Sequence, residues 1–348
     1  MVDESIIIEQ FFSHLRNLGI TPKENFYPIL DGQTHRFATE DDRSSQKSGA
    51  YYIHPDGFVN FGAMDFRKHS CMQKGSISRD YRPKYDKKQY EKAIEESRRR
   101  QAERAKQEKE KEAHARVQMM KEFTTYDKER GILFCNTAFV NHPYLIFKGV
   151  EGIPFQAALN CNFRVKKNQT SNDDFSQVGD LLIPLVHVDS VYSPKIEERM
   201  RDLQIISGRL NHEGEYQKSF YKDISRKGCY CELIPHRCRG NNSLLDLNNV
   251  QIIFITEGVA TGLSLLALTD FKSPVFCAMS CHNFMNIAQH FHKLFKNIQI
   301  IIAADNDYSG LGVKRANEVI EAGYAVNKII PPEIGQDWND YYLTIRRA

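Results

Sequence analysis

Strand-like and helix-like segments alternate along the carboxyl-terminal part of the chain, and this alternation limits the possible folds more than any other feature. Apolar segments rich in isoleucine and valine lie at 251–256, 274–279, 297–304 and 324–330. The segments between them show the helical spacing of apolar residues. This order is typical of a parallel sheet with helices on both faces. We therefore expect an α/β domain over residues 251–348.

A second group of strand-like segments precedes this domain. They lie at 180–189, 203–210 and 216–223, where β-branched and aromatic residues recur. The composition of residues 124–250 is that of a mixed region. We expect an α+β lobe there.

Residues 81–123 have the most biased composition of the chain. Glu, Lys, Arg, Gln and Ala dominate, and neither Gly nor Pro occurs between Tyr85 and Phe123. This composition predicts one long, solvated helix. Because acidic and basic residues are evenly interleaved, a spacer between domains is favoured. The alternative is a basic arm that contacts phosphate through the three arginines at 98–100.

Residues 1–80 predict a small α+β module, β-rich after an opening helix. Apolar residues from Ile7 to Leu18 recur at helical spacing, and short aromatic segments between Asp31 and Met72 are punctuated by Gly and Asp, as in hairpins. The aromatic side chains of this module either stack on bases or, as we favour, fill a small core. They are Tyr51, Tyr52, Phe58 and Phe61.

Composition places few limits on function. The apolar fraction of 41% is enough for real cores, and a net charge of +3 neither favours nor excludes nucleic acid as a partner. No run of about 18 apolar residues is present and the acidic start is unlike a signal peptide, so we expect a cytoplasmic protein without membrane contact. The scattered cysteines indicate reduced thiols.

Three acidic residues directly follow expected strands. Glu257 comes after 251–256, and Asp305 and Asp307 come after 297–304. The carboxyl ends of parallel strands meet at one edge of a sheet, and residues two apart in an extended segment face the same way. We therefore expect these three carboxylates to share one site.

Carboxylates that lie close together repel one another. At about 4 Å the cost is about 4 kcal/mol for an effective dielectric constant of about 20, so Asp305 and Asp307 together favour a bound divalent cation. Oxygen ligands, with no His or Cys expected at the same strand ends, favour Mg²⁺ or Mn²⁺ over zinc. The alternative is that the two aspartates only cap the next helix. Asp337 and Asp340 either supply outer metal ligands or form a surface turn.

Three segments together resemble the Toprim domain of DNA primases from conjugative plasmids and satellite phages. They are ITEGVATGLS, IIAADNDYSGLGVKRA and DWND, in the order and spacing of that family. HPYLIFKGV, LLIPLV, LQIISGRL and YQKSFYKDISRKGCY are similar to the lobe that precedes Toprim in these primases and in bacterial replicative primases. DGQTHRF and GAYYIHPDGFVNFG are similar to the amino-terminal module of the plasmid and phage group.

The resemblance implies a template-directed primase that uses Mg²⁺ or Mn²⁺, nucleoside triphosphates and single-stranded DNA. Glu257 would act in acid/base catalysis and would join Asp305 and Asp307 as a metal ligand. Four basic residues of the upstream lobe would face template and triphosphate, although each is equally consistent with an ordinary surface cation. They are Arg209, Lys218, Lys222 and Lys227.

The chain departs from this family at two points. It has no CxxC pair of a zinc ribbon, and the nearest substitute is the set Cys229, Cys231, His236 and Cys238. Ordinary buried cysteines are favoured over zinc there, because a CxC pair in a strand points both thiols to one face. The chain also lacks a GxxxxGK motif followed by Ser or Thr, so we expect a separate helicase or relaxase to open the duplex.

Two other functions are compatible with the same residues. One is a Toprim nuclease that breaks phosphodiester bonds through the same metal sites. The other is a nucleic-acid-binding accessory protein that has lost turnover and recruits a helicase or relaxase through the charged helix. The upstream lobe favours a primase over a nuclease, and the intact Glu257, Asp305 and Asp307 argue against an inactive protein.

Overall fold

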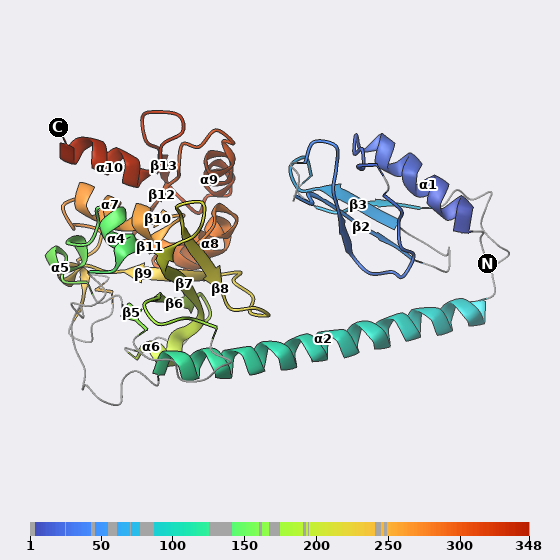
Figure 1. Cartoon of the computed structure of the whole chain (residues 1–348), viewed down its shortest axis with the longest axis horizontal. Coiled ribbons are helices and arrows are strands. Elements are labelled where there is room, and N and C mark those ends of the chain that lie inside the picture. The colour runs from blue at the N-terminus through green and yellow to red at the C-terminus, as the bar shows by residue number, and fades with distance from the viewer. Residues whose placement is uncertain are drawn as a thin grey trace. The chain divides into compact units, whose positions relative to one another are not determined.

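The computed structural model describes residues 4–24, 26–42, 46–54, 61–69, 71–76, 87–124, 141–159, 162–166, 175–190, 193, 195–240, 245–246 and 249–347. The chain divides into two compact units, Met1–Glu103 and Arg104–Ala348. The boundary falls within one long helix, α2 (Lys87–Thr124), shown in Figure 1. The division into four parts at 80, 123 and 250 stays a prediction.

The amino-terminal unit is a helix packed on a small antiparallel sheet. Its elements are α1 (Glu4–Asn17), β1 (His35–Phe37), β2 (Gly49–Ile53), β3 (Phe61–Asp65) and β4 (Gln73–Gly75), with the strands in sequence order. Tyr51 and Phe61 are 2% and 3% exposed and pack with Phe11 of α1. These two rings fill the core, as favoured from the sequence. Tyr52 is partly buried, and Phe58 lies outside the described residues.

Helix α2 forms where the charged segment predicts it, and its last turns belong to the second unit. Met119 and Phe123 are fully buried in the core of that unit. Glu122, also buried, forms an ion pair with Lys166 at 3.3 Å. The end of α2 is therefore fixed to the second unit. Of the three arginines considered as phosphate contacts, Arg99 is exposed, and the side chains at 98 and 100 lie outside the described residues.

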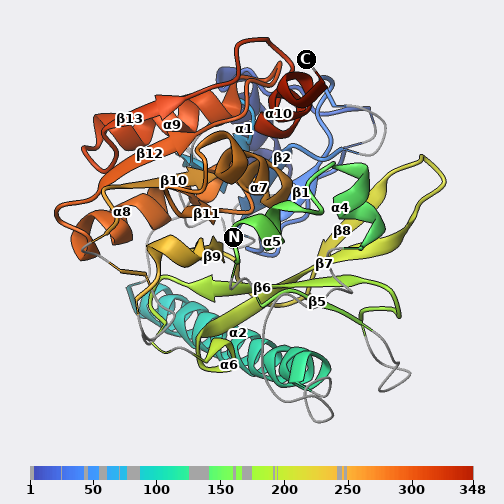
Figure 2. The same cartoon turned by 90° about the vertical axis from the view of Figure 1, so that its left-hand side faces the viewer.

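One mixed sheet forms the centre of the second unit. Its strands are β5 (Arg164–Val165), β6 (Leu181–His187), β7 (Met200–Leu210), β8 (Tyr216–Phe220), β9 (Cys229–Leu233), β10 (Ile252–Thr256), β11 (Val275–Cys277), β12 (Gln299–Ala303) and β13 (Asn327–Ile329). Their order is β13-β12-β10-β11-β9-β6-β7-β8, with β5 paired to β6. The first four strands in this order are parallel and the others antiparallel. Figure 2 shows them descending from β13 to β6 and β7.

The upstream lobe and the α/β domain share this sheet. β11 pairs antiparallel with β9, so that Val275 lies opposite Leu233 and Cys277 opposite Cys231. The parallel half therefore continues without a break into the antiparallel half. This pairing fixes the strands of the upstream lobe, including β8, relative to the carboxyl ends of the parallel strands.

Helices cover both faces of the sheet, as the sequence predicts. They are α4 (Pro143–Phe147), α5 (Ile153–Gln156), α6 (Ile196–Arg199), α7 (Val259–Leu268), α8 (Phe284–Leu294), α9 (Leu311–Glu321) and α10 (Trp338–Arg347), with short 3₁₀ turns η2 (His236–Cys238) and η3 (Cys281–Asn283). One core contains Leu263 of α7 and Trp338 of α10, and the other contains Phe291 of α8 and Val319 of α9. Figure 1 shows these two pairs of helices on opposite sides of the sheet.

The residues considered for zinc are divided between the two faces. Cys229 and Cys231 are buried in the core on the α7 side, whereas Cys238 is buried in the core on the α8 side and His236 is exposed. The four residues do not form a zinc site, and the alternative of ordinary buried cysteines holds. The cysteines within the described ranges carry free thiols. No described helix combines the length and apolar character that a membrane span requires.

Candidate active site at the carboxyl ends of the parallel strands

The ends of three neighbouring parallel strands define the candidate site. β10 lies between β11 and β12, and Thr256 at its end is paired with Cys277 and Ala303. Glu257 is the next residue and begins the turn into α7. Asp305 follows β12 by two residues at the same edge. The parallel pairing thus brings these two acidic residues together, as expected from their place after apolar strands.

Glu257 is partly buried, and its surroundings favour the protonated form. Burial raises the pKa of Glu257, and the negative charge of Asp307 raises it further. Hydrogen bonds to the backbone and thiol of Cys281 and the charge of Lys218 act in the opposite direction without cancelling this rise. A carboxylate with a raised pKa is a better proton acceptor near neutral pH than an ordinary one.

Asp305 carries a buried oxygen with no partner. Its Oδ1 is inaccessible to solvent and makes no hydrogen bond. Burial raises the pKa of Asp305 to about 7, and the charges of four other carboxylates contribute to this rise. They are Asp337, Glu257, Asp307 and Asp340. The other four acidic residues singled out from the sequence therefore lie near enough to Asp305 to repel its charge.

Asp307 stabilises the turn that leads into α9. It is exposed, and its Oδ1 accepts hydrogen bonds from the Ser309 hydroxyl at 2.8 Å and the Gly310 amide at 2.9 Å. These bonds shape the turn into α9. The alternative of a capping role thus accounts for one oxygen of Asp307, but it does not account for the buried, unpartnered oxygen of Asp305.

Asp337 and Asp340 begin a helix that the sequence did not predict. The Asp340 amide donates to Asp337 Oδ1 at 2.8 Å, and the Asp337 amide donates to Asp340 Oδ2 at 3.2 Å. The two carboxylates therefore cap the first turn of α10 reciprocally. The surface turn considered from the sequence is the start of this helix.

Lys218, an exposed residue of β8 in the antiparallel half of the sheet, interacts electrostatically with the carboxylates. Its Nζ lies 5.4 Å from the centroid of the Tyr144 ring. Burial, followed by the charge of Lys148, lowers the pKa of Lys218, whereas the charges of Asp337 and Asp305 raise it. Lys218 is thus the basic residue, among those named from the sequence, that the structure brings to the acidic cluster.

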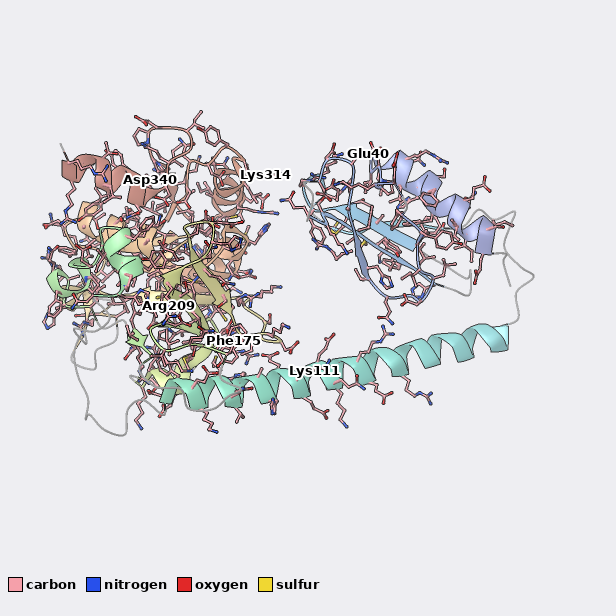
Figure 3. The ribbon with its side chains drawn as sticks, in the orientation of Figure 1. Glu40, Lys111, Phe175, Arg209, Lys314 and Asp340 are labelled. Atoms are coloured by element: carbon pink, nitrogen blue, oxygen red, sulfur yellow. The ribbon has the colours of Figure 1, made fainter. Side chains whose placement is uncertain are left out.

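The other three basic residues lie at the surface too. Arg209, Lys222 and Lys227 are exposed and form no ion pair with the described carboxylates of the site. Figure 3 labels Arg209, near the end of β7, and Asp340 on α10. Lys222 instead lines an open groove of about 530 Å³ with Lys111 of α2 and Phe175.

Two residues near the site were missed from the sequence. Lys148, at the end of α4, acts electrostatically on Lys218, and Cys281, four residues after β11, contacts Glu257. Cys281 follows β11, which is not one of the two strands whose ends were expected to lack His and Cys. β11 was recognisable as a parallel strand, so the loop that follows it could have been searched. Lys148 gave no such signal, because its proximity depends on packing between distant segments.

The residues present fit a divalent cation by their chemistry. Carboxylate oxygens are the ligands that Mg²⁺ and Mn²⁺ prefer, and the unpartnered Asp305 Oδ1 is available as one of them. Within the described ranges, however, no group of three or more His, Cys, Asp or Glu side chains is arranged to hold one ion. The carboxylates are near enough to interact but do not converge on one point.

Comparison with known proteins agrees with the sequence resemblance. Residues 252–345 match the family model described as the Toprim domain. This segment spans the strands, helices and acidic residues described above, from β10 to α10.

Distant similarities extend to solved primase structures. The primase fragment of the bacteriophage T7 primase-helicase is 16% identical, with a TM-score of 0.36 over 63% of this chain and 77% of that chain. The Escherichia coli primase catalytic core is 14% identical, with a TM-score of 0.38 over 66% of this chain and 75% of that chain. The zinc-binding and RNA polymerase domains of Aquifex aeolicus primase are 11% identical, with a TM-score of 0.40 over 99% of this chain and 83% of that chain.

Proposed function

Because residues 252–345 form a Toprim domain, we propose that this protein is a metal-dependent DNA primase. Such a nucleotidyltransferase joins nucleoside triphosphates into short primers on a single-stranded DNA template. The upstream segments support a primase over a Toprim nuclease, since they resemble the lobe that primases carry at this place. The same resemblance supports an origin in a plasmid or phage.

The proposal depends most on the meeting of Glu257 and Asp305 with Lys218. The two carboxylates come from adjacent parallel strands, and the lysine comes from β8 in the antiparallel half. The charges of these residues act on one another. A negative cluster with a cation beside it suits a ligand that carries both phosphate groups and metal ions.

In this proposal the side chains of the site share the tasks of binding and catalysis. Lys218 binds the triphosphate through its ammonium group and orients it toward the carboxylates. Glu257, with its raised pKa, accepts the proton of the attacking 3′ hydroxyl. Asp305 and Asp307 hold Mg²⁺ or Mn²⁺, with Glu257 as a further ligand and Asp337 and Asp340 as outer ligands. A bound divalent ion would supply positive charge to the phosphate oxygens during the transfer.

The proposed partners follow from this activity. They are a single-stranded DNA template, nucleoside triphosphates and a separate helicase or relaxase that exposes the template. Arg209, Lys222 and Lys227 are proposed template contacts, since exposed cations suit the phosphate backbone.

One assay tests the proposal against its alternatives. The full chain is incubated with unlabelled single-stranded DNA, labelled ribonucleotides and Mn²⁺ or Mg²⁺, and in parallel with end-labelled DNA. New short oligomers are expected. Shortened DNA without new oligomers would identify a nuclease, and DNA binding without either product would identify an inactive accessory protein.

A variant pair separates chemistry from folding. Glu257→Gln keeps the size of the side chain but cannot accept the proton, so it should abolish primer synthesis and leave DNA binding nearly unchanged. Glu321→Gln is the matched control, because Glu321 is exposed at the end of α9. Primer synthesis by Glu257→Gln at the control rate would remove Glu257 from the reaction.

A further inference from the structure

Helix α10 holds the turn that carries Lys148, although the two are far apart in sequence. Asn339 Nδ2 donates to the Lys148 carbonyl at 2.8 Å, and Arg346 Nη1 donates to the Gly149 carbonyl at 3.0 Å. Leu343, between them on α10, packs so closely that a Cβ placed at Gly149 would lie 2.7 Å from it. Three side chains of one helix therefore hold a single two-residue turn.

The turn has a backbone conformation that few residues adopt easily. Gly149 has a φ of +63°, in the left-handed region, and it ends α4 directly after Lys148. Its amide donates to the Ile146 carbonyl at 2.9 Å. The main chain at Lys148 is therefore restricted from both sides, by α4 itself and by α10.

Asn339 connects this turn to the helix that follows Glu257. It is fully buried, and its Nδ2 also donates to the Ser264 hydroxyl of α7 at 3.0 Å. α7 begins two residues after Glu257. The side-chain amide of Asn339 thus connects the turn at Lys148 to α7, the helix that follows Glu257.

Lys218 lies beside the helix that Lys148 ends, because its Nζ is 5.4 Å from the centroid of the Tyr144 ring in α4. The two ammonium groups repel each other, and the same Lys218 interacts with Asp305 and Asp337. Two cations that repel each other are stabilised by an anion that lies near both. The triphosphate of a nucleotide is an anion of the required charge.

We propose that Asn339 and Arg346 are positioning residues, which fix the turn at Lys148 so that Lys148 and Lys218 bind the triphosphate of the incoming nucleotide together. This inference rests on the proposed function and adds the carboxyl-terminal helix to it. α10 then has two tasks, since it brings Asp337 and Asp340 to the acidic cluster and sets the cation opposite them.

A double-mutant cycle tests the positioning role of Asn339. The affinity for ATP is the measured quantity. The affinity of the full chain for ATP with Mg²⁺ is measured by titration calorimetry for the wild type, Lys148→Met, Asn339→Ala and the double variant. Each single substitution should weaken binding about tenfold, because each removes the effect of one charged contact. In the Lys148→Met background Asn339→Ala should weaken binding less than about twofold, because the residue that it positions is already lost.

A variant at an exposed residue of α10 tests the same positioning role if Asn339→Ala fails to fold. Arg346→Ala removes one contact from an exposed side chain and should weaken ATP binding about threefold, with Arg346→Lys restoring most of it. Arg347→Ala, on the same helix, is the matched control. Multiplicative losses in the cycle, or unchanged ATP binding by both Asn339→Ala and Arg346→Ala, would overturn the positioning role.

The outcome is distinguishable from failure of the proposed function. If the protein makes no primers but the two substitutions do not weaken ATP binding independently, the primase proposal is wrong. α10 then remains a positioning element of a nucleotide-binding site. If the protein makes primers but the losses of ATP affinity in the two single variants multiply in the double variant, the primase proposal stands and the positioning role of α10 is wrong.

Discussion

Asn306 and Gln336 form an antiparallel β-bridge between the end of β12 and the segment that precedes α10. The Asn306 amide donates to the Gln336 carbonyl at 2.9 Å, and the Gly335 amide donates to the Asn306 carbonyl at 2.6 Å. Asn306 is the residue between the two aspartates after β12. The bridge therefore explains why Asp337, the next residue after Gln336, lies near enough to Asp305 to raise its pKa.

Asp305→Asn should weaken metal binding and raise the stability of the metal-free protein. In metal-free buffer at about pH 8 the variant should unfold with a free energy higher by about 2 kcal/mol, because it lacks one buried negative charge among four others. Excess Mg²⁺ should stabilise the wild type, by about 2.7 kcal/mol at a hundred times the dissociation constant, and the variant much less. Chemical denaturation with EDTA or with Mg²⁺ measures both effects. Equal stabilisation of both proteins by Mg²⁺ would exclude Asp305 as a ligand.

Lys218→Met should weaken triphosphate binding. The residue supplies a positive charge that interacts with Asp305, so its loss should lower the affinity for ATP with Mg²⁺ about tenfold. Lys293→Met, at an exposed position on α8, is the control with the same change of charge. Calorimetric titration of both variants measures the difference, and equal affinities for ATP would remove Lys218 from the nucleotide site.

The stability of the protein should depend on pH through Asp202. This carboxylate is fully buried, and burial raises its pKa to about 6 from an ordinary value of 3.8, although Arg226 lies 3.8 Å away. The folded protein thus holds the proton more tightly than the unfolded chain. The resulting stability is fully present below about pH 4 and is lost as the pH rises through about 6.

Asp202→Asn should remove this dependence. Between about pH 5 and about pH 7.5 the wild type should lose roughly 1.4 kcal/mol of unfolding free energy more than the variant does. Urea denaturation at the two pH values measures this difference. Asp223→Asn, at an exposed position, should behave as the wild type. If Asp202→Asn showed the same pH dependence as the wild type, the proton would be bound elsewhere.

The stability of the protein should depend on both residues of the buried ion pair at the end of α2, Glu122 and Lys166. Glu122 accepts hydrogen bonds from Lys166 and from the Phe175 amide, at 3.3 and 2.7 Å. Glu122→Ala should cost about 3 to 5 kcal/mol because it leaves the Lys166 ammonium buried without its carboxylate.

Replacing both partners separates the charge effect from packing. The double variant Glu122→Leu and Lys166→Met should recover most of the lost stability, since neither charge is then buried. Glu108→Ala, on an exposed turn of α2, should change the unfolding free energy by less than about 0.5 kcal/mol. Thermal or urea denaturation measures these differences, and a loss below about 1 kcal/mol for Glu122→Ala would show that the pair does not anchor the helix.

The sequence by itself determined the parallel half of the sheet and the place of its acidic residues. Strands and helices from β10 to β13 were predictable because their periodicity is local, and a residue that follows a parallel strand must lie at the same edge as its neighbours. Glu257 and Asp305 could therefore be placed together without any knowledge of tertiary contacts. For the same local reason it was predictable that both thiols of the CxC strand, Cys229 and Cys231, point to one face.

Only the tertiary structure decided which other groups face those carboxylates. The pairing of β11 with β9 brings Lys218 to the acidic cluster, and it joins segments whose local sequence does not specify a partner. α10 was missed because its reciprocal caps and its packing against α7 are not visible in DWND alone. Lys148 and Cys281 reach the site through contacts between distant segments, and such contacts depend on how the whole chain packs rather than on the spacing of residues along it.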